Sequence, residues 1–290
     1  MTKRKGIIWD DTGKRGIDMN KSFVNRIWAF VLSLAIFSSV FAFNPTEAKA
    51  ATNLELNQTY NLTVSGNEHD TLTFQTPGTG YFYVNILVTD VKNGQGESIY
   101  GNFMSAVMDL DGQTLMYELV GKSNGMQTSK AYSYAPSHTA TISVSADTTM
   151  NWTYYYQITV VNVTPKNFET EDNNSAKKAD AIKLKQTYNG ILNKKYDDED
   201  WFVFKAPNTG SYKFYVQNTD DARTGDFFYA TGYKSKHTVD RKNFSYTSFH
   251  AGKGWKSSKK IKLKKGAKYY IRITDPLYES IPYRIKVKKA

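Results

Sequence analysis

The sequence contains no cysteine, which excludes disulfide bonds and thiolate metal sites. Signatures of catalysis are missing as well, because none of the four histidines stands in an H-E-x-x-H spacing and there is no G-x-S-x-G elbow. Neighbouring carboxylates at Asp197-Asp198-Glu199-Asp200 could act as the acid pair of a glycoside hydrolase, but a turn or a metal site explains them more simply. We therefore predict a protein that is not an enzyme.

The N-terminal region has the features of an export signal. Lys21 and Arg26 precede an apolar run over residues 27–43, and Ala48-Lys49-Ala50 supplies a small-x-small cleavage pattern. This predicts a signal peptide over residues 1–50, with Met19 as a possible true start. The alternative is a membrane anchor, although the run is near the lower length limit for a span. We expect a secreted protein, extracellular or cell-wall associated, not stably inserted in a membrane, and typical of a Gram-positive bacterium.

Two stretches of the chain repeat each other. Gln58-Thr59-Tyr60 matches Gln186-Thr187-Tyr188, an offset of 128 residues, and residues 74–81 match residues 204–211, an offset of 130. A nearly constant offset is the sign of a duplicated structural unit. The sequence therefore predicts one domain at 51–164, an acidic linker at 165–175 and a second domain at 176–290.

Both copies show the period-two alternation of β-strands. Phe82, Val84, Ile86 and Val88 fall on one face of a strand, and Asp111-Gly112 is typical of a hairpin turn. In the second copy we expect strands near 182–184, 201–204, 212–216, 227–233, 261–263, 269–273 and 283–287. The predicted fold is all-β, with two tandem jelly-roll-like antiparallel β-sandwich domains.

Charge is divided unequally between the copies. Residues 51–165 hold 3 Lys and 9 Asp and Glu, whereas residues 166–290 hold 27 Lys and Arg and 14 Asp and Glu. An acidic and a basic domain can attract each other, which allows self-association, and the basic domain can attract polyanions. Both possibilities remain open at this stage.

The second copy also resembles a known family. Glu171-Asp172-Asn173-Asn174-Ser175, Ala179-Asp180, Gly190-Ile191-Leu192, Asp200-Trp201-Phe202-Val203-Phe204 and Gly210 resemble the bacterial pre-peptidase C-terminal (PPC) domain. That family is similar to the calcium-binding, collagen-binding domains of clostridial collagenases, and the resemblance implies a jelly-roll-like sandwich. It covers about 168–290, and it reaches 51–164 mainly through the internal repeat.

The resemblance implies a calcium site in the acidic segment. The matching positions are Glu169, Glu171, Asn173, Asn174 (where those relatives carry Asp) and Asp200. The first three also point the same way in an extended chain, and calcium takes six to eight oxygen ligands. The alternative is a solvated acidic linker with an Asn-capped turn. In the first copy Asp70 stands in the place of Asp200, but no Glu-x-Glu precedes Leu54, so we predict no site there.

A second candidate site is a stripe of cations near the C-terminus. Its members are Lys260, Lys262, Lys264, Arg272, Arg284, Lys286 and Lys288, with Trp255, Tyr269 and Tyr283 as possible aromatic neighbours. Alternation with apolar residues places the cations on the face opposite the core, where adjacent strands would merge them into one patch. The patch would bind an extracellular polyanion, and the alternative is ordinary solubility and edge-strand protection by lysine. No nucleic-acid recognition motif is present.

These features predict a non-catalytic binding protein for cell-wall polymer, polysaccharide or a matrix protein, with the second module stabilised by calcium. The alternatives are a self-assembling structural component, through docking of acidic on basic domains, and an accessory factor of a secreted peptidase. Collagen is disfavoured as the ligand. In the relatives, the contacting tyrosines follow a turn that matches Gly266-Ala267-Lys268-Tyr269-Tyr270, whereas here Thr274-Asp275-Pro276-Leu277 comes next.

Overall fold

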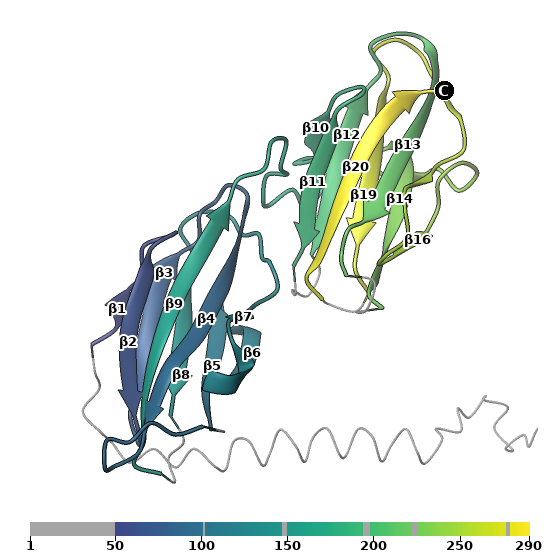
Figure 1. Cartoon of the computed structure of the whole chain (residues 1–290). Coiled ribbons are helices and arrows are strands. Elements are labelled where there is room, and N and C mark those ends of the chain that lie inside the picture. The colour runs from purple at the N-terminus through teal and green to yellow at the C-terminus, as the bar shows by residue number, and fades with distance from the viewer. Residues whose placement is uncertain (1–49, 101, 147–149, 194–197, 222–224, 277–278) are drawn as a thin grey trace, which may run out of the picture. The chain divides into compact units, whose positions relative to one another are not determined.

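The computed structural model describes residues 50–290 except 101, 147–149, 194–197, 222–224 and 277–278 (Figure 1). Apart from Ala50, the predicted signal peptide lies outside the described residues. Among the described residues, no helix is long and apolar enough to cross a membrane. Apart from turns and loops, the described chain consists of β-strands and one short 3-10 helix, η1 (Lys122–Asn124).

The first sandwich is built from nine strands in two sheets. They are β1 (Thr52–Asn53), β2 (Thr59–Ser65), β3 (His69–Gln75), β4 (Tyr81–Lys92), β5 (Phe103–Leu110), β6 (Gln113–Gly121), β7 (Gln127–Thr128), β8 (Thr139–Ser145) and β9 (Thr153–Val163). Sheet A has the order β1-β3-β8-β5-β6, and sheet B has the order β2-β9-β4-β7.

The second sandwich has eleven strands. They are β10 (Asp180–Ile182), β11 (Thr187–Leu192), β12 (Glu199–Lys205), β13 (Gly210–Asn218), β14 (Phe227–Ser235), β15 (Thr238–Val239), β16 (Thr247–His250), β17 (Lys256–Ser257), β18 (Ile261–Leu263), β19 (Lys268–Thr274) and β20 (Ile281–Lys289). Sheet C has the order β11-β20-β13-β17, with β18 also on β13, and sheet D has the order β10-β12-β19-β14-β15, with β16 also on β14.

The two sandwiches share one topology. Each begins with a short strand that pairs in parallel with the third strand of its copy, β1 with β3 and β10 with β12. One sheet of each sandwich contains the order β2-β9-β4 in the first copy and β11-β20-β13 in the second. The other sheet contains the order β3-β8-β5-β6 in the first copy and β12-β19-β14-β15 in the second. This is the strand order of a jelly roll. The predicted all-β tandem sandwich fold is confirmed.

Alternate side chains fill each core. Strand β4 alternates buried and half-buried residues from Tyr81 to Val88, which confirms the predicted inward face. The core of the second sandwich is rich in aromatic rings, with Phe214 stacked on Tyr269 at 4.9 Å between centroids. Strands β5 and β6 are joined by the predicted Asp111-Gly112 turn, in which both residues have positive φ values (50° and 77°). Such a turn matches the twist of the strands it connects.

Single hydrogen bonds repeat between the copies as well. The Tyr60 hydroxyl accepts the Glu55 N–H at 2.9 Å, and the Tyr188 hydroxyl accepts the Lys183 N–H at 3.1 Å. These equivalences follow the sequence match at residues 58–60 and 186–188. The duplication therefore extends from sequence to side-chain contacts.

A buried serine also recurs at the edge of sheets B and C. Ser129 Oγ accepts the Val84 N–H at 2.9 Å and donates to the Lys130 carbonyl. In the second copy, Ser258 Oγ accepts the Phe214 N–H at 3.1 Å and donates to the Lys259 carbonyl. In each sandwich one serine hydroxyl thus accepts a backbone N–H of an interior strand, β4 in the first copy and β13 in the second.

Replacing either serine by alanine leaves a buried backbone N–H without its acceptor. We expect Ser129→Ala and Ser258→Ala each to lower the free energy of unfolding of its own sandwich by about 1–3 kcal/mol, measured by urea denaturation. Ser257 is exposed, so Ser257→Ala serves as the matched control and should change the value by less than about 0.5 kcal/mol. Equal stability of Ser258→Ala and Ser257→Ala would contradict the shared role of the two serines.

Candidate functional site: a buried acidic cluster and a basic sheet face

The acidic segment at residues 167–175 runs across one end of the second sandwich. Glu169 N–H donates to the Asn189 carbonyl and Asn189 N–H donates to the Asn167 carbonyl, both at 3.0 Å, which ties the segment to β11 in sheet C. Further along, the Asn173 carbonyl accepts the Trp201 N–H of β12 in sheet D at 3.2 Å. Between these anchors the chain turns at Asp172, which has a φ of 65°. The predicted linker region is therefore hydrogen-bonded into the second sandwich.

This path brings several acidic side chains into a buried cluster. Glu169 is 5% exposed, Asp198 is 7% exposed and Asp200 is fully buried. The Glu169 carboxylate accepts the Ile191 N–H at 2.6 Å, and the Asp198 carboxylate accepts the Asn193 N–H at 2.6 Å. The half-buried Glu171 accepts a bond from the Asn193 side-chain amide at 3.2 Å.

Tyr283 on β20 joins two of these carboxyl groups. Its hydroxyl lies 2.7 Å from Asp200 Oδ2 and is also hydrogen-bonded to Glu169. A phenol has one proton to donate, so it can serve both carboxyl groups only if one of them is protonated and donates in return. Without a cation, the cluster is therefore built for at least one neutral carboxyl group.

Electrostatics leads to the same conclusion. Burial, followed by the charge of Glu171, raises the pKa of Glu169 well above its usual range. Burial and the charge of Glu169 do the same to the pKa of Asp200. Burial and the charge of Asp198 raise the pKa of Glu171 to about 8. Each carboxylate is thus costly to ionise while its neighbours are charged.

Close approach to Gly190 makes the cluster possible. A Cβ at this position would overlap both the Tyr283 hydroxyl and the Glu169 carboxylate. Gly190 is one of the residues on which the resemblance to the PPC domain rests. The close contact explains why a glycine is needed at this position. Only glycine lets both side chains pack against the β11 backbone at this point.

Two buried oxygens in the cluster have no hydrogen-bond partner among the described residues: Asn173 Oδ1 and Asp200 Oδ1. A buried acceptor without a partner costs about 1–3 kcal/mol. Within the described ranges, however, no three Asp, Glu, His or Cys side chains converge as ligands of one ion. The donor set consists only of carboxylate and amide oxygens, which is the chemistry that calcium prefers. Its residues therefore fit calcium in kind, while their arrangement is that of a proton-sharing cluster.

Of the predicted calcium ligands, Glu169, Glu171, Asn173 and Asp200 come together at this end of the sandwich. Asn174 has a buried Oδ1 for which the described part of the chain offers no hydrogen-bond partner, but it lines a separate hollow on the outer face of sheet D. Asp198 and Tyr283 belong to the cluster without having been predicted as part of it. Asp198 lies within the Asp197–Asp200 run and could have been chosen, whereas Tyr283 lies more than 80 residues away on another strand.

The first sandwich contains a simpler version of the same arrangement. The Tyr156 hydroxyl donates to Asp70 Oδ2 at 2.7 Å, the same distance as between Tyr283 and Asp200. Asp70 and Asp200 occupy equivalent positions on β3 and β12. The sequence before Leu54 lacks the two glutamates that surround this pair in the second copy. The Asp–Tyr pair is thus the shared element, and the acidic segment is an addition to it.

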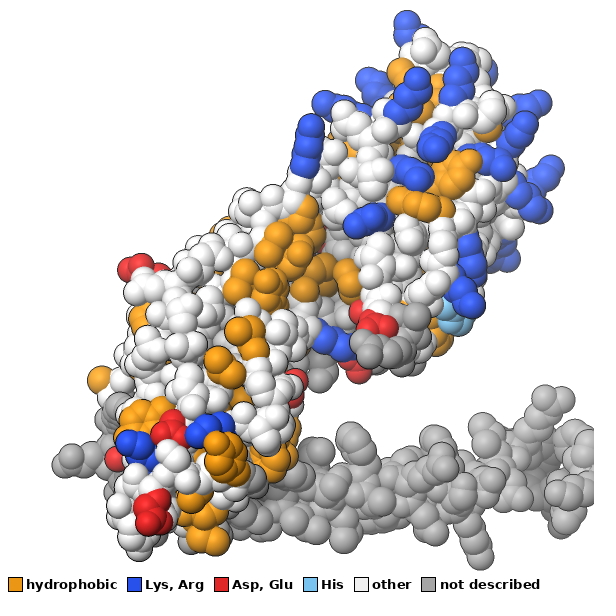
Figure 2. Space-filling view, viewed as in Figure 1, with side chains coloured by type: hydrophobic (Ala, Val, Ile, Leu, Met, Phe, Trp, Pro, Cys, Tyr) orange, Lys and Arg blue, Asp and Glu red, His pale blue; other side chains and the backbone are white. Residues whose placement is uncertain are grey.

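The basic residues divide between two sheets. Arg284, Lys286 and Lys288 of β20 alternate with buried residues and stand opposite Gln217, Tyr215 and Lys213 of β13 on the outer face of sheet C. Lys262 of β18 stands opposite Ser211 in the same sheet, and the exposed Lys260 and Lys264 flank that strand. Figure 2 shows Lys and Arg side chains gathered over the second sandwich. We call Lys260, Lys262, Lys264, Arg284, Lys286 and Lys288, together with Trp255, the basic face.

Three predicted members of the stripe do not belong to the basic face. Tyr269 and Tyr283 are 0% and 1% exposed, because their odd-numbered positions face the core together with Ile271 and Ile285. Arg272 lies on β19 in sheet D, where it forms an ion pair with Glu199 at 3.1 Å. The prediction of a single patch was wrong for these residues, because β19 belongs to a different sheet from β18 and β20.

Trp255 was correctly placed beside the cations. Lys286 Nζ lies 3.4 Å from the centroid of the Trp255 ring. Tyr215, which was not predicted, lies 5.8 Å from Lys286 Nζ and 5.7 Å from Lys288 Nζ. The alternation within residues 212–216 could have identified Tyr215 as an outward residue, but not its neighbours on β20. Partial burial and repulsion by Lys288 lower the pKa of Lys286.

The acidic cluster predicts a pH dependence of stability. The pKa of Glu171, about 8, lies above its ordinary value, so its protonated form stabilises the fold and its ionisation removes that stability as the pH rises. Glu169 and Asp200 shift in the same direction. In EDTA, we expect the midpoint of thermal unfolding to fall by about 5 °C or more between pH 5 and pH 9. Asp200→Asn should flatten this dependence, and a midpoint that rises over this range would refute the assignment.

No protein-family model matches the chain, and no curated protein matches it. Among solved structures, the PPC domain of a collagenase from Bacillus anthracis is 21% identical, with 38% of this chain and 94% of that chain covered and a TM-score of 0.28. The tandem CBM22 modules of Xyn10C from Paenibacillus barcinonensis are 10% identical (84% and 100% covered, TM-score 0.25). The CUB1-EGF-CUB2 domains of rat MASP-1 are also 10% identical (82% and 100% covered, TM-score 0.26). At these identities and TM-scores the similarities establish no family for this chain, and they carry no argument about function.

Proposed function

We propose that this is a secreted, non-catalytic binding protein whose second sandwich attaches to an anionic cell-wall polymer or polysaccharide through the basic face. The placement of Lys286 Nζ 3.4 Å from the Trp255 ring centroid carries this proposal, together with Tyr215 beside Lys286 and Lys288. Cations that only keep a surface soluble have no need of aromatic neighbours, whereas a ligand with acidic groups and sugar rings uses both.

The electrostatics of the basic face favours an anion. Burial and like-charge repulsion lower the pKa of Lys286, and a bound carboxylate or phosphate would offset the repulsion. The aromatic rings offer flat apolar area between the charges. The positive excess of residues 166–290 attracts polyanions over a longer range, and this attraction is screened by salt.

Removing two charges from the basic face should weaken binding to an acidic polymer. With polygalacturonate as the probe, we expect Lys286→Gln/Lys288→Gln to lower the affinity about tenfold, measured by affinity electrophoresis at low salt. Lys205→Gln/Lys268→Gln makes the same charge change on an exposed cross-strand pair of sheet D, so it is the matched control and should stay within about twofold. Equal losses in both variants would show that net charge alone decides binding.

We also propose that the acidic cluster binds calcium, with oxygens from Glu169, Glu171, Asn173 and Asp200. Three observations support this: unpartnered oxygens on Asn173 and Asp200, one phenol shared by two carboxyl groups, and raised carboxyl pKa values. A divalent cation would satisfy the oxygens and offset the repulsion between the carboxylates. Calcium would then stabilise the path of the acidic segment between sheets C and D.

Calcium should therefore stabilise the protein most where the carboxyl groups are ionised. At pH 8, saturating calcium is expected to raise the midpoint of thermal unfolding by about 5–10 °C, and the increase should be smaller at pH 5. Asp200→Asn should abolish the shift. Asp70→Asn changes the equivalent residue of the first sandwich and should leave the shift intact, so it controls for a general loss of stability. An unchanged midpoint in calcium at pH 8 would remove the proposal.

A further inference from the structure

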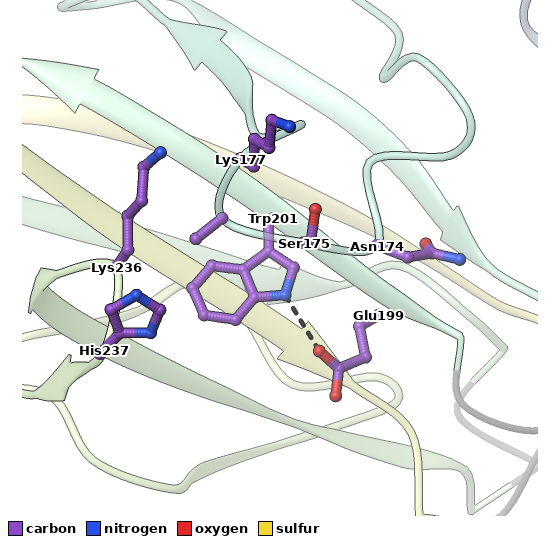
Figure 3. A pocket seen from close by; sticks show the side chains of 8 residues that line it. Asn174, Ser175, Lys177, Glu199, Trp201, Lys236 and His237 are labelled. Atoms are coloured by element: carbon purple, nitrogen blue, oxygen red, sulfur yellow. Dashed lines mark hydrogen bonds between the residues drawn. The ribbon is translucent and has the colours of Figure 1, made fainter.

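A hollow of about 490 Å³ lies on the outer face of sheet D (Figure 3). It is lined by Ser175 and Lys177 of the loop before β10, by Glu199 and Trp201 of β12, and by Lys236 and His237 of the turn between β14 and β15. Its volume is in the range of sites that hold one small molecule. Since sheets C and D pack face to face around one core, the hollow and the basic face are on opposite sides of the second sandwich.

The floor of the hollow is packed against other side chains of sheet D. The Trp201 ring packs on Tyr233 at 4.8 Å between centroids, and both rings belong to a small apolar cluster separate from the main core. The Arg272 guanidinium lies 5.8 Å from each of the two ring centroids. Trp201 is only 6% exposed, so a ligand would meet part of the indole rather than its full face. A packed aromatic floor needs no rearrangement to accept a ligand.

The one carboxylate in the hollow is already neutralised. Glu199 Oε2 accepts the Trp201 indole N–H at 3.0 Å (Figure 3), and Glu199 Oε1 accepts an Arg272 N–H at 3.1 Å. Both carboxylate oxygens are therefore occupied by bonds within the floor. Glu199 orients the indole and cancels the charge of Arg272, so it leaves little repulsion toward an incoming anion.

The cations around the hollow are not neutralised in this way. Lys177 and Lys236 are exposed, and in the described part of the chain neither forms an ion pair. They come from two separate loops, and Figure 3 shows Lys236 and His237 on one side of the indole and Lys177 on another. The hollow thus combines a partly apolar floor, neutral hydrogen-bonding groups such as the Ser175 hydroxyl, and two unpaired ammonium groups.

We infer that this hollow binds one acidic sugar unit, a hexuronate-type residue. Its carboxylate pairs with Lys177 and Lys236, its hydroxyls bond to the Ser175 hydroxyl and its ring rests on the accessible part of Trp201. A bare anion would use only the lysines, and a neutral sugar would leave them unpaired. The site is separate from the basic face, so it stands or falls independently of the proposed function. With both, one sandwich could hold two polymer chains.

The test uses the purified protein and glucuronic acid, glucose and acetate as probes. Binding is followed by NMR on the Trp201 indole N–H signal, which is assigned by its disappearance in Trp201→Phe. We expect glucuronate to shift this signal and to bind at least about tenfold more tightly than glucose or acetate. Lys177→Gln/Lys236→Gln should weaken glucuronate binding about fivefold or more. Lys205→Gln/Lys268→Gln makes the same charge change on an exposed pair of sheet D outside the hollow and should stay within about twofold.

Each other outcome overturns the inference. Acetate binding as tightly as glucuronate would reduce the hollow to a general anion site. Glucose binding as tightly would remove the role of the lysines, and so would unchanged affinity in Lys177→Gln/Lys236→Gln. An equal loss in Lys205→Gln/Lys268→Gln would show that net charge alone decides binding. Because all four substituted lysines have their ammonium groups outside the core, these comparisons do not depend on refolding of the core.

Discussion

Alternation along the last strand connects the core of the second sandwich with both of its candidate sites. On β20, Tyr283, Ile285 and Val287 point into the core, while Arg284 and Lys288 point to solvent with the half-buried Lys286 between them. The inward series also includes Ile281, and within it the hydroxyl of Tyr283 reaches the acidic cluster. A slip of one residue in register would exchange the two faces, exposing the tyrosine and burying cations. Packing of the core therefore holds the geometry of both sites.

The two sandwiches share one scaffold and differ in what they add to it. Both keep the parallel starting strand, the buried serine and the Asp–Tyr pair. Only the second adds glutamates beside that pair and cations on the outer face of its β11-β20-β13 sheet. These additions leave the apolar interior unchanged, because they occupy a loop and outward positions. New sites could thus arise without a new fold.

Much of the strand pattern was predictable because it depends on neighbouring residues. The inward face of β4, the Asp111-Gly112 turn and the span of β18 follow from alternation and local turn chemistry. Sheet membership is not local. Arg272 and Lys286 look alike in sequence, but β19 pairs with β12 and β14 while β20 pairs with β11 and β13. One predicted stripe was therefore divided between two opposite faces.

The amino-acid sequence by itself determined the β class, the duplication, the charge asymmetry and most members of the acidic cluster, since each of these is written in composition, periodicity or short spacing. Tertiary structure alone decided that Tyr283 bridges Glu169 and Asp200, that Tyr215 and Trp255 flank Lys286, and that Lys177 and Lys236 meet around Trp201. The physical reason is strand pairing over long range. Contacts between residues far apart in the sequence, up to 114 positions for Glu169 and Tyr283, depend on which strands become neighbours, and that depends on how the whole core packs.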